Sequence, residues 1–103
     1  MKTYPLIHNN KLFAFEIDNT FIRLSTIAKL LNKINNISDI RVRKMFSDEP
    51  ADIKIRFKYN GIEYIILEEY DDSSVYWIGP DNENKEEDIS IIEKKFSEYN
   101  FFR

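Results

Sequence analysis

The chain contains no cysteine, a single histidine and only two glycines. Without cysteine it forms neither disulfide bonds nor thiolate zinc sites, which fits a reducing compartment. The one histidine, His8, precedes the first expected strand, and no nucleophile-elbow motif is present, so a catalytic triad has no support. Glycine occurs only at Gly61 and Gly79, so there is no Gly-rich phosphate loop. These absences predict a protein that is not an enzyme and has no catalytic residues.

Long apolar segments are missing as well. No run of residues approaches the roughly 18–20 needed to cross a bilayer, and residues 1–10 lack the apolar core of a signal peptide. We therefore expect a cytoplasmic protein that makes no membrane contact. A length of 103 residues predicts a single domain, residues 1–103, with one modest core.

Charge is unevenly distributed, although the net charge is only −3. Residues 1–59 carry 11 Lys/Arg and 6 Asp/Glu, whereas residues 60–103 carry 4 Lys/Arg and 12 Asp/Glu. Such an asymmetry can mark a surface for a charged partner. The alternative is that the two halves interleave in the fold and neutralise each other.

Hydrophobic periodicity predicts five strands and two helices. The expected strands cover residues 12–18, 38–46, 53–59, 62–69 and 75–78, and the expected helices cover residues 25–35 and 86–99. Ser25 is the expected N-cap of the first helix. The second helix has an alternative start, because residues Ser90 to Glu93 match a capping box. Asn60-Gly61 predicts a type I′ hairpin turn, because both central positions of that turn need positive φ. The resulting register places Lys58 opposite Glu63, where we expect a cross-strand ion pair.

The order β-α-β-β-β-β-α with short turns predicts an α+β fold. We expect a two-layer sandwich in which an antiparallel meander of four or five strands carries both helices on one face. That face would hold Phe57, Tyr59 and Tyr64. The opposite face would expose a set of basic and apolar side chains: Arg41, Arg43, Lys54, Arg56, Lys58, Ile65 and Leu67.

The segment around the last expected turn combines acidic and aromatic residues. Tyr and Trp are favoured at protein interfaces because they bury a large area beside a polar group, and an acidic rim steers a basic partner toward the surface. The candidate partner-binding residues are Glu68, Glu69, Asp71, Asp72, Tyr76 and Trp77. The alternative is a solvated hairpin turn next to aromatic core residues.

Metal ions and cofactors are not expected. Residues 81–88 are rich in oxygen ligands, but Glu83 and Lys85 stand where a calcium loop has Asp or Asn, and no glycine follows.

Nucleic-acid binding is a further alternative, through the basic residues Arg41, Arg43, Arg56 and Lys58. Sheets that read RNA expose aromatic side chains, whereas here the aromatics alternate onto the opposite face. An acidic chain also repels phosphate, so a protein partner is favoured over a nucleic acid.

Residues 57–80, FKYNGIEYIILEEYDDSSVYWIGP, resemble a family of short stand-alone bacterial proteins of mostly unknown function. The resemblance continues in EEDISIIEKKF, residues 86–96, and covers about the last half of the chain. The family has an arginine where Val75 stands in this chain.

In size, acidity and α+β order, the chain is also similar to small immunity proteins of bacterial toxin–immunity systems, including contact-dependent growth inhibition. This resemblance implies a cytoplasmic protein that binds and neutralises a basic toxin domain. A nucleic-acid-binding regulator and an uncharacterised small enzyme stay open as alternatives.

Overall fold

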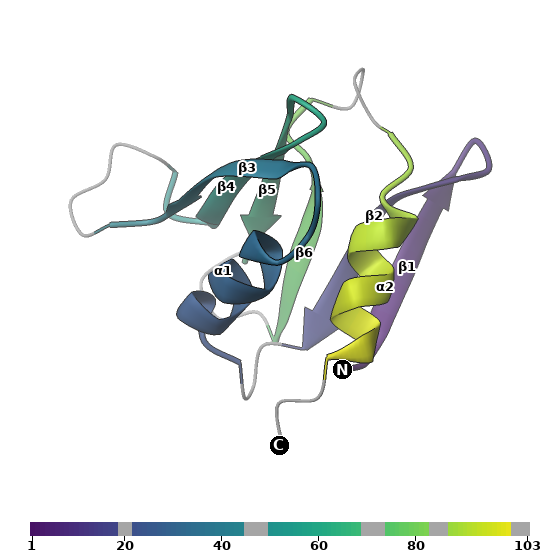
Figure 1. Cartoon of the computed structure of the whole chain (residues 1–103). Coiled ribbons are helices and arrows are strands. Elements are labelled where there is room, and N and C mark those ends of the chain that lie inside the picture. The colour runs from purple at the N-terminus through teal and green to yellow at the C-terminus, as the bar shows by residue number, and fades with distance from the viewer. Residues whose placement is uncertain (19–21, 45–49, 69–73, 83–86, 100–103) are drawn as a thin grey trace.

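Six strands and two helices make up the structure, a computed structural model that describes residues 1–18, 22–44, 50–68, 74–82 and 87–99. The elements are β1 (Thr3–His8), β2 (Lys11–Asp18), α1 (Leu24–Asn32), β3 (Ile37–Val42), β4 (Ile53–Tyr59), β5 (Ile62–Leu67), β6 (Val75–Pro80) and α2 (Ser90–Glu98). All strands join one antiparallel sheet in the order β1-β2-β6-β5-β4-β3 (Figure 1). The α+β class is therefore confirmed.

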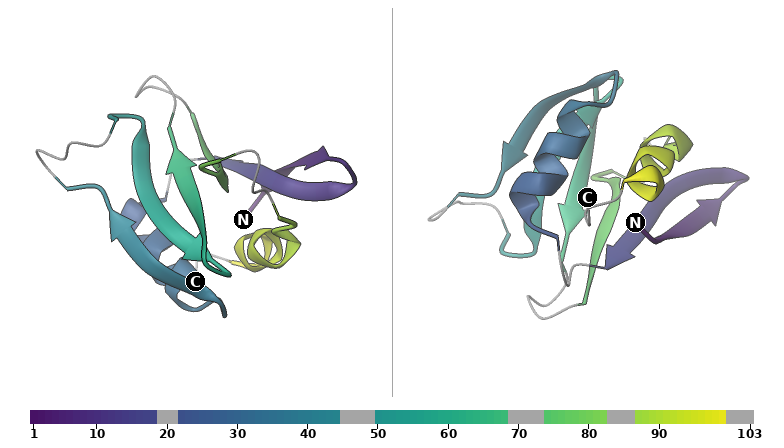
Figure 2. Two further views of the ribbon diagram at one scale, coloured as in Figure 1. Left: turned by 90° about the horizontal axis from the view of Figure 1, so that it is seen from above. Right: turned by 60° about the horizontal axis from the view of Figure 1, so that its bottom comes forward.

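The predicted meander corresponds to β3 through β6, and the pairing of β2 with β6 extends it. This pairing brings the beginning of the chain beside its acidic second half. Figure 2 shows the two ends of the twisted sheet, with α1 beside β3 and β4, and α2 beside β1 and β2. No helix in the described ranges is long and apolar enough to cross a membrane.

The expectation of four or five strands was wrong, because residues 3–8 form an additional edge strand rather than a loop. Asn9 and Asn10, with φ of 52° and 61°, connect β1 to β2 through positive-φ positions that asparagine tolerates. Pro5 lies inside β1, where its missing N–H is tolerated because an edge strand has a partner on one side only. Most of β1 is exposed, so its apolar alternation is weak.

Both helices differ from their predicted bounds at each end. α1 has Arg23 at its N-cap position with no side-chain hydrogen bond, so Ser25 lies inside the first turn and is not the cap. α2 begins at Ser90, whose N–H donates to the Asp88 carboxylate at 2.8 Å. Ser90 is thus a helical residue rather than the cap of a capping box, and Glu93 instead accepts a hydrogen bond from the Thr3 hydroxyl at 2.5 Å.

Three strand ends also differ from the prediction. β3 ends at Val42, and a register shift beside Asp39, whose φ is 52°, interrupts its alternation. β5 ends at Leu67. β6 continues to Pro80, so Gly79 belongs to the strand and does not terminate it.

Side chains from both helices and from the sheet belong to one hydrophobic cluster. The Phe15 and Phe96 rings pack edge to face with centroids 5.3 Å apart, which joins β2 to α2. Tyr64 stacks on Phe57 at 5.8 Å, as the predicted hairpin register requires. The predicted alternation along β4 is confirmed, because its four apolar and aromatic residues are buried while the three basic residues between them are half-buried.

Candidate functional site

The β4–β5 hairpin determines which side chains point away from the hydrophobic cluster. Asn60 and Gly61 have φ of 52° and 80°, and Phe57 pairs with Tyr64 as predicted. Directly paired residues share a face of a sheet. The face opposite Phe57 and Tyr64, which we call the outer face, therefore carries Glu16, Trp77, Leu67, Ile65, Arg56, Glu63, Lys58 and Arg41.

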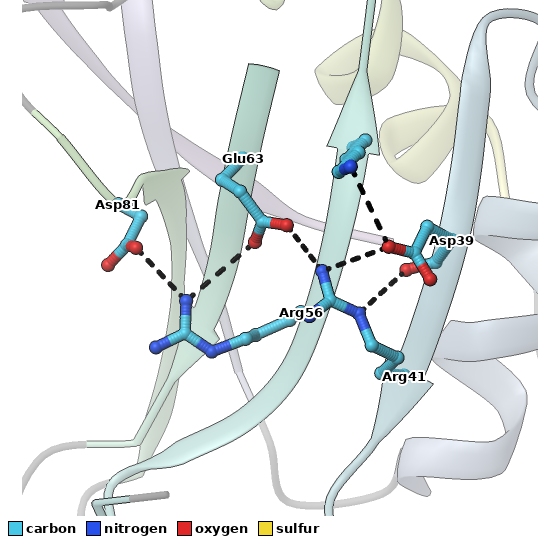
Figure 3. Close-up of polar contacts among 6 residues, drawn as sticks. Asp39, Arg41, Arg56, Glu63 and Asp81 are labelled. Carbon is cyan, nitrogen blue, oxygen red and sulfur yellow. Dashed lines mark hydrogen bonds and ion pairs between the residues drawn. The ribbon is translucent and has the colours of Figure 1, made fainter. Parts of the chain in front are cut away.

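Three acids and three bases form a continuous network on the outer face and at its margin (Figure 3). Its members are Asp39, Arg41, Arg56, Lys58, Glu63 and Asp81. Glu63 lies at the centre, bonded to Arg41 and 3.7 Å from an Nη of Arg56. Arg56 also donates to the Asp81 carboxylate at 3.0 Å. The network carries no net charge, because its acids and bases are equal in number.

The predicted ion pair between Lys58 and Glu63 does not form, although their backbone register is the predicted one. The ammonium of Lys58 contacts Asp39 at 3.9 Å, and Glu63 is shared by two arginines. A guanidinium has five N–H donors in a planar fork and can bridge two carboxylates. The side chains are 18% to 49% exposed, so each pair contributes only about 0.2–1 kcal/mol.

A second set of outer-face residues lies in a line across four neighbouring strands. Tyr4 on β1 pairs with Glu16 on β2, Glu16 pairs with Trp77 on β6, and Trp77 pairs with Leu67 on β5. We call these four residues the aromatic row. Asp18 lies on the same side of β2 as Glu16, and its carboxylate accepts a hydrogen bond from the Tyr4 hydroxyl at 3.3 Å. The aromatic row and the neighbouring Asp18 thus place two carboxylates beside two aromatic side chains.

Trp77 is held in place by small residues beneath its ring. A Cβ atom at Gly79 would lie only 2.4 Å and 2.6 Å from two atoms of the indole ring, so the ring occupies the space that a side chain would need. The same Cβ would lie 2.9 Å from the Cβ of Ala14, which is fully buried. Glycine at this position therefore allows the half-buried indole to approach the backbone closely.

The structure separates the residues that were predicted to bind a partner. Trp77 lies on the outer face, whereas Tyr76 is 8% exposed and belongs to the hydrophobic cluster. Burial raises the pKa of the Tyr76 hydroxyl, and the nearby charge of Glu68 raises it further. Glu68 is half-buried, and its backbone N–H donates to the backbone carbonyl of Asp52 at 2.9 Å. That Glu68 and Tyr76 contact a partner stays a prediction.

The other predicted residues, Glu69, Asp71 and Asp72, lie outside the described part of the chain. The sequence analysis missed Tyr4, Glu16 and Asp18. Alternation within residues 12–18 already separates the last two from Phe15 and Ile17. No local signal reveals that β2 pairs with β6, which is what brings Glu16 to Trp77.

Comparison with protein-family models, with curated proteins and with solved structures finds no significant match to the chain. Among the described residues, no group of three or more histidine, aspartate or glutamate side chains could hold a metal ion. The chemistry that the aromatic row offers is non-covalent: aromatic surface for packing, and carboxylates that attract a cation.

Proposed function

We propose that the chain is a cytoplasmic protein-binding module, an immunity protein that binds and neutralises a basic bacterial toxin domain through its aromatic row. The observation that carries the proposal is the direct cross-strand alignment of Tyr4, Glu16 and Trp77. Tyrosine and tryptophan are enriched among the residues that contribute most to protein interfaces. The size, acidity and α+β order that the chain shares with small immunity proteins support the same function.

We also infer a two-layer arrangement, with both helices on the face of Phe57, Tyr59 and Tyr64. It is supported by the shared hydrophobic cluster, which contains buried residues of both helices together with these three aromatics. In this arrangement neither α1 nor α2 lies over the outer face, which leaves it available to a partner. Its Ile65 is 8% exposed, so the central part of this face is already packed and the aromatic row lies toward the β1 end.

Electrostatics favours a basic partner for the aromatic row. Glu16 and Asp18 lie on it or beside it, and Glu68 directly follows Leu67. Complementary charge raises the association rate and excludes partners of the same sign. Glu69, Asp71 and Asp72 would add to the negative potential, and their contribution stays a prediction.

The charged network counts against the nucleic-acid alternative. Arg41, Arg43, Arg56 and Lys58 were its expected phosphate ligands. Arg41, Arg56 and Lys58 are each paired with a carboxylate, and Arg43 donates to the backbone carbonyls of Pro50 and Ile53. Phosphate binding would require these pairs to break, while the chain as a whole is acidic. No specific contact among the residues that the structure describes favours a small enzyme.

A capture experiment followed by an inhibition assay tests the proposal. The chain is used as bait in a lysate of its native host, and the captured protein is purified and assayed with and without a stoichiometric amount of the chain. Inhibition is expected. Reversing two charges, Glu16→Lys with Asp18→Lys, should weaken the complex at least about 100-fold, because like charges across an interface cost several kcal/mol.

The control is Glu98→Lys, which reverses one exposed charge on α2 and changes the net charge half as much. It should leave the affinity within about twofold, and all variants should retain the thermal stability of the parent. A second arm, Asp71→Lys with Asp72→Lys, tests the predicted turn. The proposal is wrong if no protein is captured, if the captured protein keeps its activity, or if the Glu16 and Asp18 reversal weakens binding no more than Glu98→Lys does.

A further inference from the structure

We propose that Glu16 binds the guanidinium group of a partner arginine, which stacks on Trp77 and is flanked on the other side by Tyr4. The inference rests on the proposed function, since it names the chemical group that the aromatic row recognises. It goes further in assigning a single anchor and in distinguishing arginine from lysine.

Strand geometry brings the three side chains within reach of one cation. Neighbouring strands are about 4.8 Å apart, so Tyr4 and Trp77 lie on backbones separated by about 10 Å, with Glu16 midway between them. A cation bound to the Glu16 carboxylate can therefore lie within about 6 Å of an aromatic ring, the range over which cation–π attraction operates. The indole is fixed over Gly79, so its position does not have to be acquired on binding.

Glu16 differs in its bonding from Glu63, the central carboxylate of the charged network, and from Asp18, which accepts a hydrogen bond from Tyr4. Glu63 is shared by two arginines. Within the described part of the chain, the Glu16 carboxylate has neither an ion pair nor a side-chain hydrogen bond. It is half-buried between two aromatic neighbours, where charge interactions are less screened than at a fully exposed position. Its pairing capacity is thus available to a partner.

The chain already places one cation of its own at this surface. The Lys2 ammonium lies 5.3 Å from the centroid of the Tyr4 ring. This contact demonstrates that a basic side chain can approach Tyr4, and Lys2 would compete with an incoming positive charge or repel it. Removing the charge of Lys2 should therefore strengthen the binding of a cationic ligand.

Arginine fits the site better than lysine does. A guanidinium is planar and weakly hydrated, so it can stack on the indole of Trp77 while two N–H groups bind the Glu16 carboxylate. An ammonium is a compact charge with a strong hydration shell and cannot form this two-point contact. The geometry of a carboxylate next to a ring therefore favours arginine.

Trp77 provides a specific signal for the test, because it is the only tryptophan in the chain. The intact protein is titrated at low salt with a capped tetra-arginine peptide, and its tryptophan fluorescence is followed. Tetra-lysine at the same charge and NaCl at matched ionic strength are the comparisons. We expect a saturable change with tetra-arginine and binding by tetra-lysine that is several-fold weaker.

Three variants localise the binding. Glu16→Gln should weaken tetra-arginine about tenfold, as expected for loss of a charge-assisted contact, and Glu16→Asp should restore part of the affinity. Glu98→Gln makes the same change in net charge on α2 and should change the affinity less than twofold. Lys2→Gln should increase the affinity, and circular dichroism confirms that each variant is folded.

Several results would overturn the inference: no saturable response, equal weakening by Glu16→Gln and Glu98→Gln, or tighter binding of tetra-lysine. These results are distinguishable from failure of the proposed function. If the captured partner still needs Glu16 and Asp18 while the peptide does not bind, the guanidinium assignment is wrong and the inhibitor proposal stands. If the peptide binds at Glu16 but no inhibited partner is found, the guanidinium assignment stands and the inhibitor proposal is wrong.

Discussion

Replacing Gly79 with alanine should destabilise the protein by moving Trp77. The new Cβ would lie 2.4 Å and 2.6 Å from two indole atoms, whereas ordinary van der Waals contacts are 3.4–4 Å. The indole would have to shift by about 1 Å, and the Cβ of Ala14, at 2.9 Å, blocks movement of the new methyl group on another side. Gly79 is not among the positive-φ residues, so the cost comes from packing and not from backbone strain.

Two opposing effects determine how much Gly79→Ala changes the free energy of unfolding. Overpacking costs about 1–3 kcal/mol. The reduced freedom of the unfolded chain returns about 0.5–1 kcal/mol when alanine replaces glycine. The net loss in the free energy of unfolding is therefore roughly 0–2.5 kcal/mol, centred near 1 kcal/mol. A loss of about 1 kcal/mol corresponds to a fall in Tm of roughly 4–8 °C for a domain of this size.

Urea unfolding followed by circular dichroism and by Trp77 fluorescence measures both consequences. Gly79→Ala should lower stability, shift the native tryptophan emission and weaken the binding of tetra-arginine. The matched control is Gly61→Ala, which has open space around its Cβ and a φ of 80°. It should cost stability through backbone strain without changing the tryptophan emission. Unchanged stability and emission in Gly79→Ala would refute the packing argument.

Two further predictions concern polar contacts. Glu63→Gln removes the charge shared by Arg41 and Arg56. It should lower the free energy of unfolding by roughly 0.5–2 kcal/mol at low salt and by less in 1 M NaCl. Equal losses in urea unfolding at both salt concentrations would contradict an ionic origin. Hydrogen bonds from the Ser90 side chain and backbone hold the pKa of Asp88 below its usual value. The ionised carboxylate therefore stabilises the folded state above the unfolded-state pKa of about 3.9. This stabilisation is lost as the pH falls through the lower folded-state pKa. Asp88 is exposed and water screens its charge, so Asp88→Ala should lower the free energy of unfolding by at most about 1 kcal/mol near neutral pH and by less in acid. A difference that does not change with pH would contradict this account.

Short-range signals predicted those parts of the structure whose determinants are local. Asn60-Gly61 and the alternation on either side of it predicted the β4–β5 register correctly, because a two-residue turn leaves only one pairing that buries Phe57 and Tyr64 together. Asn9-Asn10 forms a similar turn and was missed, since Pro5 and the exposure of β1 weaken its strand pattern. The start of α2 was predicted four residues too early, at residue 86 instead of Ser90. Acidic residues are favoured both inside the first turn of a helix and just before it, so the acidic residues that precede Ser90 do not define where the helix begins.

The sequence by itself determined the α+β class, the central hairpin and the division of β4 into apolar and basic sides, since each depends on residues close together in the chain. Only the tertiary structure decided which charges and rings meet. Lys58 was expected to pair with Glu63, but arginines from two strands bind that carboxylate instead. Tyr76 and Trp77 were predicted to share one partner-binding surface, but they point to opposite faces of the sheet, and Trp77 lies opposite Glu16. The reason is that strand order is determined by burying one common core, which periodicity within a segment does not encode.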